Sequence, residues 1–345
     1  MTDVFPSPLR EETIGEYLIS RGLIPGTPLW TSTLTDGVSA RVYRVDSPTH
    51  HWVVKQAMPE LRVAATWFAD PRRAITEARA LKLLGTLTPS MVPQLIDADP
   101  ETFSLTMTAA PPTWKNWKSV LLGAPDDQQS FASDLKDVAA VLGTTLGTWH
   151  RETWGREDVA AEFSDGESFE QLRVIPFHRA IAALYPEFDE RIDLLIDTIT
   201  TRAECLVHGD FSPKNILTGA TGIWVLDFEV ARFGAAVFDL AFLAHHLAMK
   251  ALVRPTFASD FSDAFEVFLR EYRIALGREL DLTTLGWHSA VLLLSRVDGV
   301  SRAQYLSENQ RSVARLAAMT VLSSSNGSGT EFWNVIAWCA QEQQS

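Results

Sequence analysis

Residues 206–217 of this chain read LVHGDFSPKNIL, and this segment is the most informative part of the sequence. An apolar strand leads into a polar loop that begins at Asp210 and ends at Asn215, where a second apolar strand starts. After a short glycine-bounded turn, a third apolar strand at 224–226 ends at Asp227. Because the three polar side chains lie at strand ends, we expect Asp210, Asn215 and Asp227 to lie close together.

These residue types suit phosphoryl transfer from ATP. An Asp and an Asn offer the hard oxygen ligands that Mg²⁺ prefers. A second Asp, set apart in the sequence, can stay off the metal, orient an acceptor hydroxyl and take its proton. The reaction also needs a lysine on the phosphates. Lys55 ends the apolar strand 52–55, and Glu77 on the following helix can pair with it.

The pattern H-G-D-x-x-x-x-N followed by D-F-E resembles the aminoglycoside phosphotransferase/choline kinase group, small-molecule relatives of the protein kinases. The resemblance implies an α+β, bilobal, protein-kinase-like fold with a small β-rich lobe and a large helical lobe. It implies that Asp210 is the catalytic base and that Asn215 and Asp227 bind the metal. Lys55 then resembles the lysine that contacts the phosphates, and Glu77 its helix partner.

The same resemblance extends to the nucleotide-binding turns. Thr108 and Ala110 resemble the hinge whose backbone binds adenine, and Gly37 and Ser39 lie in the turn that covers the nucleotide. Asp239 resembles the aspartate that braces the catalytic loop. Three departures stand out: the covering turn has a single glycine, Ser212 replaces the lysine that protein kinases carry two residues after the base, and Glu229 replaces the glycine of the metal motif.

The order of elements agrees with two lobes. We expect strands at 30–34, 40–45, 51–55, 93–96 and 103–108 with a helix at 71–84, and helices at 131–149, 169–184, 188–201 and within 238–322. Two prolines at 111–112 favour a hinge, so we expect a nucleotide-binding lobe at 1–108 and a catalytic, acceptor-binding lobe at 109–345. A Ser/Gly-rich linker, 323–330, is expected to be mobile and to precede a Trp-rich helix at 332–339.

Composition limits the function classes. The 345 residues carry a formal net charge of −13, which argues against nucleic acid or an anionic membrane as the main partner. Two cysteines exclude a disulfide scaffold. No apolar stretch approaches the ~20 residues that span a bilayer, and no signal peptide is visible, so the simplest interpretation is a cytoplasmic protein.

Several residues carry an alternative interpretation. His208 is either a general base or, as we expect, a brace for the loop, and Glu60 competes with Glu77. The adjacent pair His245-His246 is expected to pack in the core rather than to bind metal. Arg296 and Asp298 are either a structural ion pair or part of the acceptor pocket. The tryptophans, expected mostly in the core, are Trp114, Trp117, Trp149 and Trp154.

The sequence therefore predicts an ATP- and Mg²⁺-dependent phosphotransferase that acts on a hydroxyl of a small molecule, of the aminoglycoside, sugar or amino-alcohol class. The alternatives are a nucleotide-binding pseudokinase or regulatory module and a protein kinase. Ser212 counts against the protein kinase. The net charge favours a cationic acceptor, although surface charge is screened within ~8 Å. The acceptor, the choice of ATP or GTP and the oligomeric state stay open.

Overall fold

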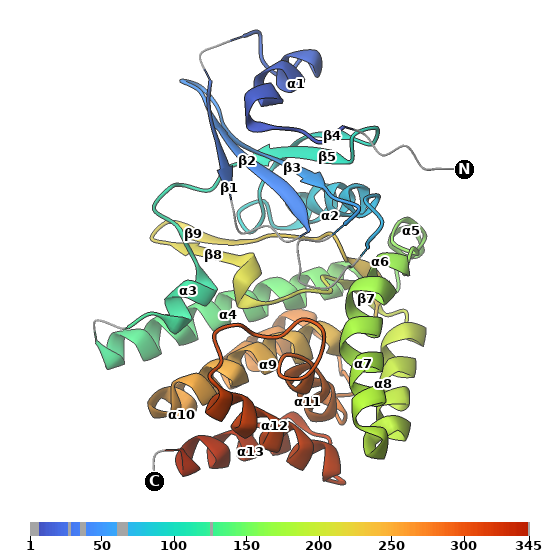
Figure 1. Ribbon diagram of the computed structural model, residues 1–345, viewed down its shortest axis with the longest axis vertical. Coiled ribbons are helices and arrows are strands. Elements are labelled where there is room, and N and C mark those ends of the chain that lie inside the picture. Colours follow the sequence, from blue (N-terminus) through green and yellow to red (C-terminus); the bar gives the residue numbers. More distant parts are fainter. Residues whose placement is uncertain (1–6, 27–28, 35–38, 61–67, 125–126, 344–345) are drawn as a thin grey trace. The chain divides into compact units, whose positions relative to one another are not determined.

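The computed structural model describes the chain except residues 1–6, 27–28, 35–38, 61–67, 125–126 and 344–345. The chain forms two compact units (Figure 1). The first comprises residues 1–114 and 217–230, and the second comprises residues 115–216 and 231–345. The first carries an antiparallel sheet and the second is mostly helical, which confirms the expected α+β fold class. The lobe boundaries at 1–108 and 109–345 stay a prediction.

The first unit is built on a five-stranded antiparallel sheet in the order β1-β2-β3-β5-β4. Its strands are β1 (Trp30–Leu34), β2 (Ala40–Asp46), β3 (His51–Ala57), β4 (Leu95–Asp99) and β5 (Ser104–Thr108). Trp52 and Val54 of β3 pack under α1 (Ile14–Ser20) in one apolar cluster. Because side chains alternate along a strand, Lys55 lies on the other face, where α2 (Arg73–Leu87) supplies its partner.

A returning segment completes the first unit. The strands β8 (Ile216–Gly219) and β9 (Gly222–Val225) are neighbours in a small sheet. The Val225 N–H donates to the Met91 carbonyl at 2.8 Å. The Trp114 ring lies so close to Gly219 that a Cβ there would come within 2.2 Å of it. The chain therefore returns to the first unit at residue 217 and presents Asp227 within it.

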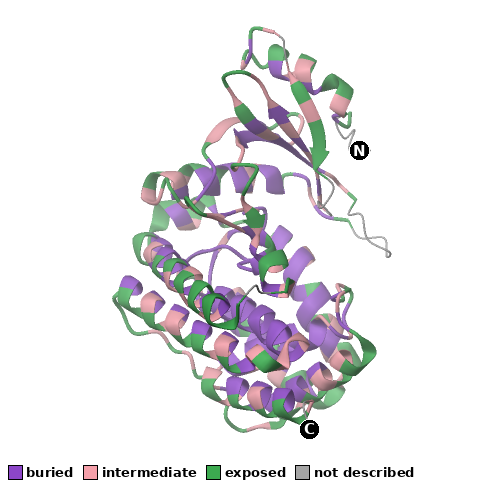
Figure 2. Cartoon of the chain, turned by 90° about the vertical axis from the view of Figure 1, so that its left-hand side faces the viewer, coloured by how far each residue is buried: buried purple, intermediate pink, exposed green. Residues whose placement is uncertain are grey.

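Helices make up most of the second unit. They are α3 (Trp117–Leu122), α4 (Gln128–Thr153), α5 (Glu157–Glu162), α6 (Glu167–Phe169), α7 (Ala180–Leu184), α8 (Asp189–Thr201), α9 (Val237–Val253), α10 (Ala258–Leu276), α11 (Leu285–Ser295), α12 (Glu308–Ser323) and α13 (Gly329–Glu342). Short strands β6 (Lys115–Asn116), β7 (Cys205–Val207) and β10 (Arg232–Gly234) lie between them, and β7 pairs with β10. Nearly every residue of α9 is buried. The helical part of the chain contains many buried residues, drawn in purple in Figure 2.

Two expectations for the second unit were wrong in detail. Residues 169–184 do not form one α-helix, because a π-helical stretch, Glu170–Arg179, separates α6 from α7. That stretch contains Pro176, which has no N–H to donate. The 323–330 linker is short and tied down, since the Gly286 N–H donates to the Gly327 carbonyl at 2.6 Å and Ser328 caps α13. None of the described helices is long and apolar enough to cross a membrane.

Candidate active site

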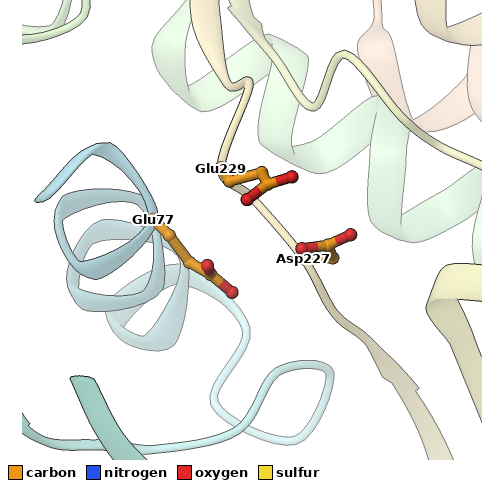
Figure 3. Close-up of side chains that lie close together, drawn as sticks. All are labelled: Glu77, Asp227 and Glu229. Carbon is orange, nitrogen blue, oxygen red and sulfur yellow. The ribbon is translucent and has the colours of Figure 1, made fainter. Parts of the chain in front are cut away.

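The candidate site in the first unit is centred on the ammonium group of Lys55. Lys55 Nζ donates to Glu77 Oε2 at 2.6 Å and also forms an ion pair with Asp227. Glu77 projects from α2 toward the segment that carries Asp227 and Glu229 (Figure 3). The predicted pairing of Lys55 with Glu77 is therefore present, and Asp227 lies beside it. The competing candidate, Glu60, is an exposed residue in an isolated bridge with Phe68.

The three carboxylates of this site crowd together. One ligand oxygen from each of Glu77, Asp227 and Glu229 lies within 4.8 Å of the others. Arg73 compensates part of this charge, because its Nε donates to Glu229 Oε2 at 2.9 Å. Burial alone would lower the pKa of Lys55, but the surrounding carboxylates outweigh it and raise that pKa. Burial and the neighbouring carboxylates raise the pKa of Glu77, against the opposing charge of Lys55.

The backbone holds Asp227 in an unusual conformation. Its φ is +71°, a value that favours glycine and that costs free energy for a residue with a side chain. The next residue, Phe228, is fully buried, while the Asp227 side chain keeps 23% of its surface exposed. Residues held in this way cluster at functional sites. Asp227 therefore has an anchored backbone and a carboxylate that remains accessible.

The candidate catalytic loop lies in the second unit, and Asp239 at the start of α9 fixes it. The carboxylate of Asp239 accepts from the backbone N–H groups of His208 at 2.7 Å and Gly209 at 2.9 Å. His150 Nε2 lies 3.4 Å from the same carboxylate, and its Nδ1 lies 2.9 Å from the Tyr272 hydroxyl. This arrangement confirms the expectation that Asp239 braces the loop.

Asp210 is buried and paired with two cations. Its Oδ2 lies 2.9 Å from Arg173 Nη2 and 2.8 Å from Lys214 Nζ. Its N–H donates to His208 Nδ1 at 3.1 Å, so His208 braces the loop as expected. Asn215 Nδ2 donates to the Asp210 carbonyl at 3.0 Å, which leaves the amide oxygen of Asn215 for a ligand. The expected meeting of Asp210 and Asn215 with Asp227 stays a prediction.

Two partners of Asp210 were not predicted. Lys214 lies four residues after Asp210, and this spacing is a signal that the sequence offered. Arg173 comes from the π-helical stretch, and its Nε also donates to the Gly209 carbonyl at 2.6 Å. It lies 37 residues before Asp210, so only the tertiary fold brings the two together.

The remaining nucleotide candidates lie in the first unit. Thr108 ends β5, and its hydroxyl accepts from the Gln94 N–H at 2.9 Å. The Ala110 carbonyl accepts from Arg44 at 3.0 Å. The Ser39 carbonyl accepts from Arg73 and from the Met58 N–H. Gly37 lies outside the described residues. Ligand binding by these four residues stays a prediction.

The structure shows the surroundings of some of the residues for which the sequence left alternatives open. Trp117 and Trp149 are buried in the core, as expected. Asp298 pairs with Arg315 through two hydrogen bonds, at 2.8 and 2.7 Å, and accepts from the Tyr185 hydroxyl at 2.6 Å. It is therefore part of a structural ion pair, but its partner is Arg315 rather than Arg296.

Comparison with known proteins gives consistent matches. Residues 30–277 match the model of the phosphotransferase enzyme family, APH. A methylthioribose kinase from Geobacillus thermodenitrificans is 24% identical over 277 residues, which cover 72% of this chain and 68% of that protein. An amicoumacin kinase in complex with AMP-PNP, Ca²⁺ and Ami has a TM-score of 0.55 at 15% identity, over 88% of this chain and 91% of that one. A choline/ethanolamine kinase family protein from Mesorhizobium loti has a TM-score of 0.51 at 13% identity, over 94% and 99%.

Proposed function

This chain belongs to the APH phosphotransferase enzyme family and is a small-molecule kinase, and from that premise we propose that it transfers the γ-phosphoryl group of ATP, with Mg²⁺, to an acceptor hydroxyl. The observation that carries the proposal is the presence of each required group. The first unit holds a lysine paired with a helix glutamate beside Asp227, and the second holds Asp210 and Asn215 on a braced loop. Family membership favours an enzyme over the pseudokinase alternative.

Lys55 is the residue proposed to hold the phosphates. Its ammonium group is kept charged by Glu77 and Asp227, and a permanent positive charge is what the α- and β-phosphates require. Its nucleotide contacts are proposed to be completed by the backbone at Thr108 and Ala110 and by Ser39.

Asp227 and Asn215 fit Mg²⁺. Asp227 offers a partly exposed carboxylate in a cluster of three, and Asn215 has an amide oxygen whose neighbouring nitrogen is already used. Carboxylate and amide oxygens are the donors that Mg²⁺ takes. When bound, the ion neutralises charge on the phosphates. The chain's own part is to keep these oxygens in place, through the backbone of Asp227 and the bond from Asn215 to the loop.

Asp210 is proposed to orient the acceptor hydroxyl and to accept its proton. The hydroxyl oxygen forms the new bond to the γ-phosphorus while the bond to the β–γ bridging oxygen breaks, and ADP leaves. The proton passes to the Asp210 carboxylate. Arg173 and Lys214 hold this carboxylate in position.

The acceptor is proposed to be a small molecule of the aminoglycoside, sugar or amino-alcohol class. The similarity to methylthioribose kinases favours a sugar within this set. A panel of compounds from the three classes, assayed for ATP consumption with the purified protein, tests this step.

The decisive variant is Asp210→Asn. The amide keeps the shape of the side chain but cannot accept the proton, so turnover should fall by about 10²- to 10⁴-fold while ATP affinity changes little. Asp137→Asn, on the exposed side of α4, is the matched control and should leave turnover unchanged. Undiminished turnover in Asp210→Asn would remove the proposed role of Asp210.

A further inference from the structure

The second unit contains a buried lysine that has no acidic partner among the residues that the structure describes. Lys250, on α9, exposes 1% of its surface. Its Nζ lies 3.5 Å from His246 Nδ1 and 5.6 Å from the centre of the Tyr305 ring. Within the described part of the chain, no carboxylate forms an ion pair with it. A buried charge without a counterion costs free energy, so the presence of Lys250 calls for an explanation.

Arg296, which follows α11, poses the same question. Its Nη1 donates to the Ser301 hydroxyl at 2.5 Å, but its Nε is buried and has no hydrogen-bond partner among the described residues. Asp298, two residues on, is already paired with Arg315. Arginine cannot shed its charge as lysine can, so a guanidinium placed here stays positive and partly unsatisfied.

These groups connect to Asp210 through packed side chains. Arg173, which pairs with Asp210, lies 5.5 Å from the centre of the Phe242 ring, and that ring lies 5.5 Å from the ring of His246. The charges of Arg173 and Asp210 both act on Arg296. Those of Lys250, Arg296 and Lys214 act on His246. Among the described residues that take part in these interactions, Asp210 is the one that carries a carboxylate. It already forms ion pairs with Arg173 and Lys214. Positive charge is therefore in excess beside the candidate base.

Part of this positively charged group is exposed to solvent. Lys250 and His246 are buried, but Arg296 and Tyr305 are each only partly covered. A further lysine lies next to Tyr305: Lys118 Nζ is 5.4 Å from the centre of the Tyr305 ring. Part of this cationic group is therefore accessible to a ligand at Arg296 and Tyr305.

We propose that Lys250 and Arg296, with His246 and Tyr305 beside them, bind an anionic group of the acceptor, a carboxylate or a phosphate. This inference rests on the proposed function, because it describes the molecule whose hydroxyl Asp210 receives. It also reverses the expectation drawn from the net charge of −13. A polycationic acceptor would be repelled by the positive charge here. An anion would instead supply the missing counterion and accept a hydrogen bond from the Nε–H of Arg296.

The experiment measures anion binding by thermal unfolding of the full chain, with AMP-PNP and Mg²⁺ in excess so that the nucleotide site is filled. Inorganic phosphate and D-gluconate are titrated in separate arms, which distinguishes a phosphate site from a carboxylate site. One anion should raise the melting temperature of the wild type. The apparent affinity for it should be at least about tenfold weaker in Lys250→Met and in Arg296→Met. Lys136→Met, which removes a half-exposed lysine of α4, should respond as the wild type does.

A second readout separates this role from a merely structural one. Without the anion, Lys250→Met should melt at a higher temperature than the wild type, because an apolar side chain replaces a buried amine whose charged form has no counterion. Gain of stability together with loss of anion binding is the expected signature. If the methionine variant does not fold, Lys250→Gln takes its place.

The outcomes distinguish the two proposals. If AMP-PNP with Mg²⁺ does not stabilise the wild type, the proposed function fails. If the nucleotide stabilises the protein but neither anion does, or if the variants respond to the anion as the wild type does, the anionic acceptor site is overturned and the kinase proposal stands.

Discussion

Lys55 is the residue that balances the charge of the first unit's site. In Lys55→Met the carboxylates of Glu77 and Asp227 lose their shared cation, and removal of one partner from a buried pair costs about 3–5 kcal/mol. The loss should depend on pH. The pKa of Glu77 is already raised, and losing Lys55 raises it further, so the folded state holds a proton that the unfolded state releases. Stability of the variant therefore falls as pH rises.

Urea unfolding of Lys55→Met and wild type at pH 5 and pH 8 measures this effect. The deficit should be larger at pH 8. Lys136→Met, whose lysine pairs with Asp263 on the surface, is the control and should change stability by less than about 1 kcal/mol at either pH. An equal deficit at both pH values would contradict the assignment of the carboxylates as the source.

For Lys250 we predict a pH dependence of stability with the opposite sign. Burial, with help from Lys118 and Arg296, lowers its pKa well below the usual value, and His246 and Tyr305 are its other neighbours. Between that lowered pKa and the ordinary one, the unfolded chain binds the proton and the folded chain does not, so wild-type stability rises with pH. The stability advantage of Lys250→Met should therefore shrink from pH 7 to pH 10. A melting series across this range checks it, and a constant difference would count against an uncompensated lysine.

At the residue scale, the sequence predicted groups whose position follows from local structure. Lys55 at a strand end and Glu77 on the next helix are fixed by short-range patterns, and the structure pairs them. Arg173, Lys250 and Arg296 come from distant helices and converge only through packing. Sequence context singled out Arg296, but no local pattern placed Arg173 or Lys250 near Asp210. Net charge was therefore the sequence's guide to the acceptor, and it favoured a cation, whereas the proposed site favours an anion.

At the element scale, two helical glycines give a matched pair of tests. Gly143 in α4 lies against α10, where an added Cβ would come within 2.3 Å of the Phe268 carbonyl oxygen. Gly85 in α2 has its nearest neighbour, a Val92 methyl group, at 3.9 Å. Gly143→Ala should therefore destabilise the protein by about 1–3 kcal/mol through overpacking. Gly85→Ala should stabilise it by about 0.5–1 kcal/mol through helix propensity.

Chemical unfolding of the two variants tests whether α4 packs this closely against α10. The comparison is matched because both variants carry the same Gly→Ala substitution within a helix. If both stabilised the protein, the close contact of α4 with α10 would be contradicted. The contact has a functional side, because α4 carries His150 and α10 carries Tyr272, which meet beside Asp239. We expect Gly143→Ala also to lower turnover.

Elements were predictable where periodicity was simple. The strand at 30–34 and the first residues of the next two agree with β1, β2 and β3, because alternation and turn residues mark them clearly. The π-helical stretch, Glu170–Arg179, was missed because its apolar spacing is close to that of an α-helix. The linker before α13 was expected to be mobile from composition alone, but its Ser and Asn side chains make capping hydrogen bonds.

At the scale of the whole molecule, the two units should respond to different ligands. AMP-PNP with Mg²⁺ is expected to slow amide hydrogen exchange in β3 and α2, which carry Lys55 and Glu77. An anion that binds the Lys250–Arg296 cluster is expected to slow exchange in α9 and at the end of α11. Exchange measured by mass spectrometry on the full chain checks both. Protection by nucleotide that spares β3 and α2 would contradict the assignment of Lys55.

The first unit is discontinuous in sequence, since residues 217–230 complete what residues 1–114 begin. A ribosome that releases the chain from its N-terminus cannot supply Asp227, or the strand partner of Met91, until about a hundred residues of the other unit have already emerged. Until then, Lys55 and Glu77 lack the carboxylate of Asp227 that completes their charged cluster. Completion of the first unit during synthesis therefore waits on the growth of the second.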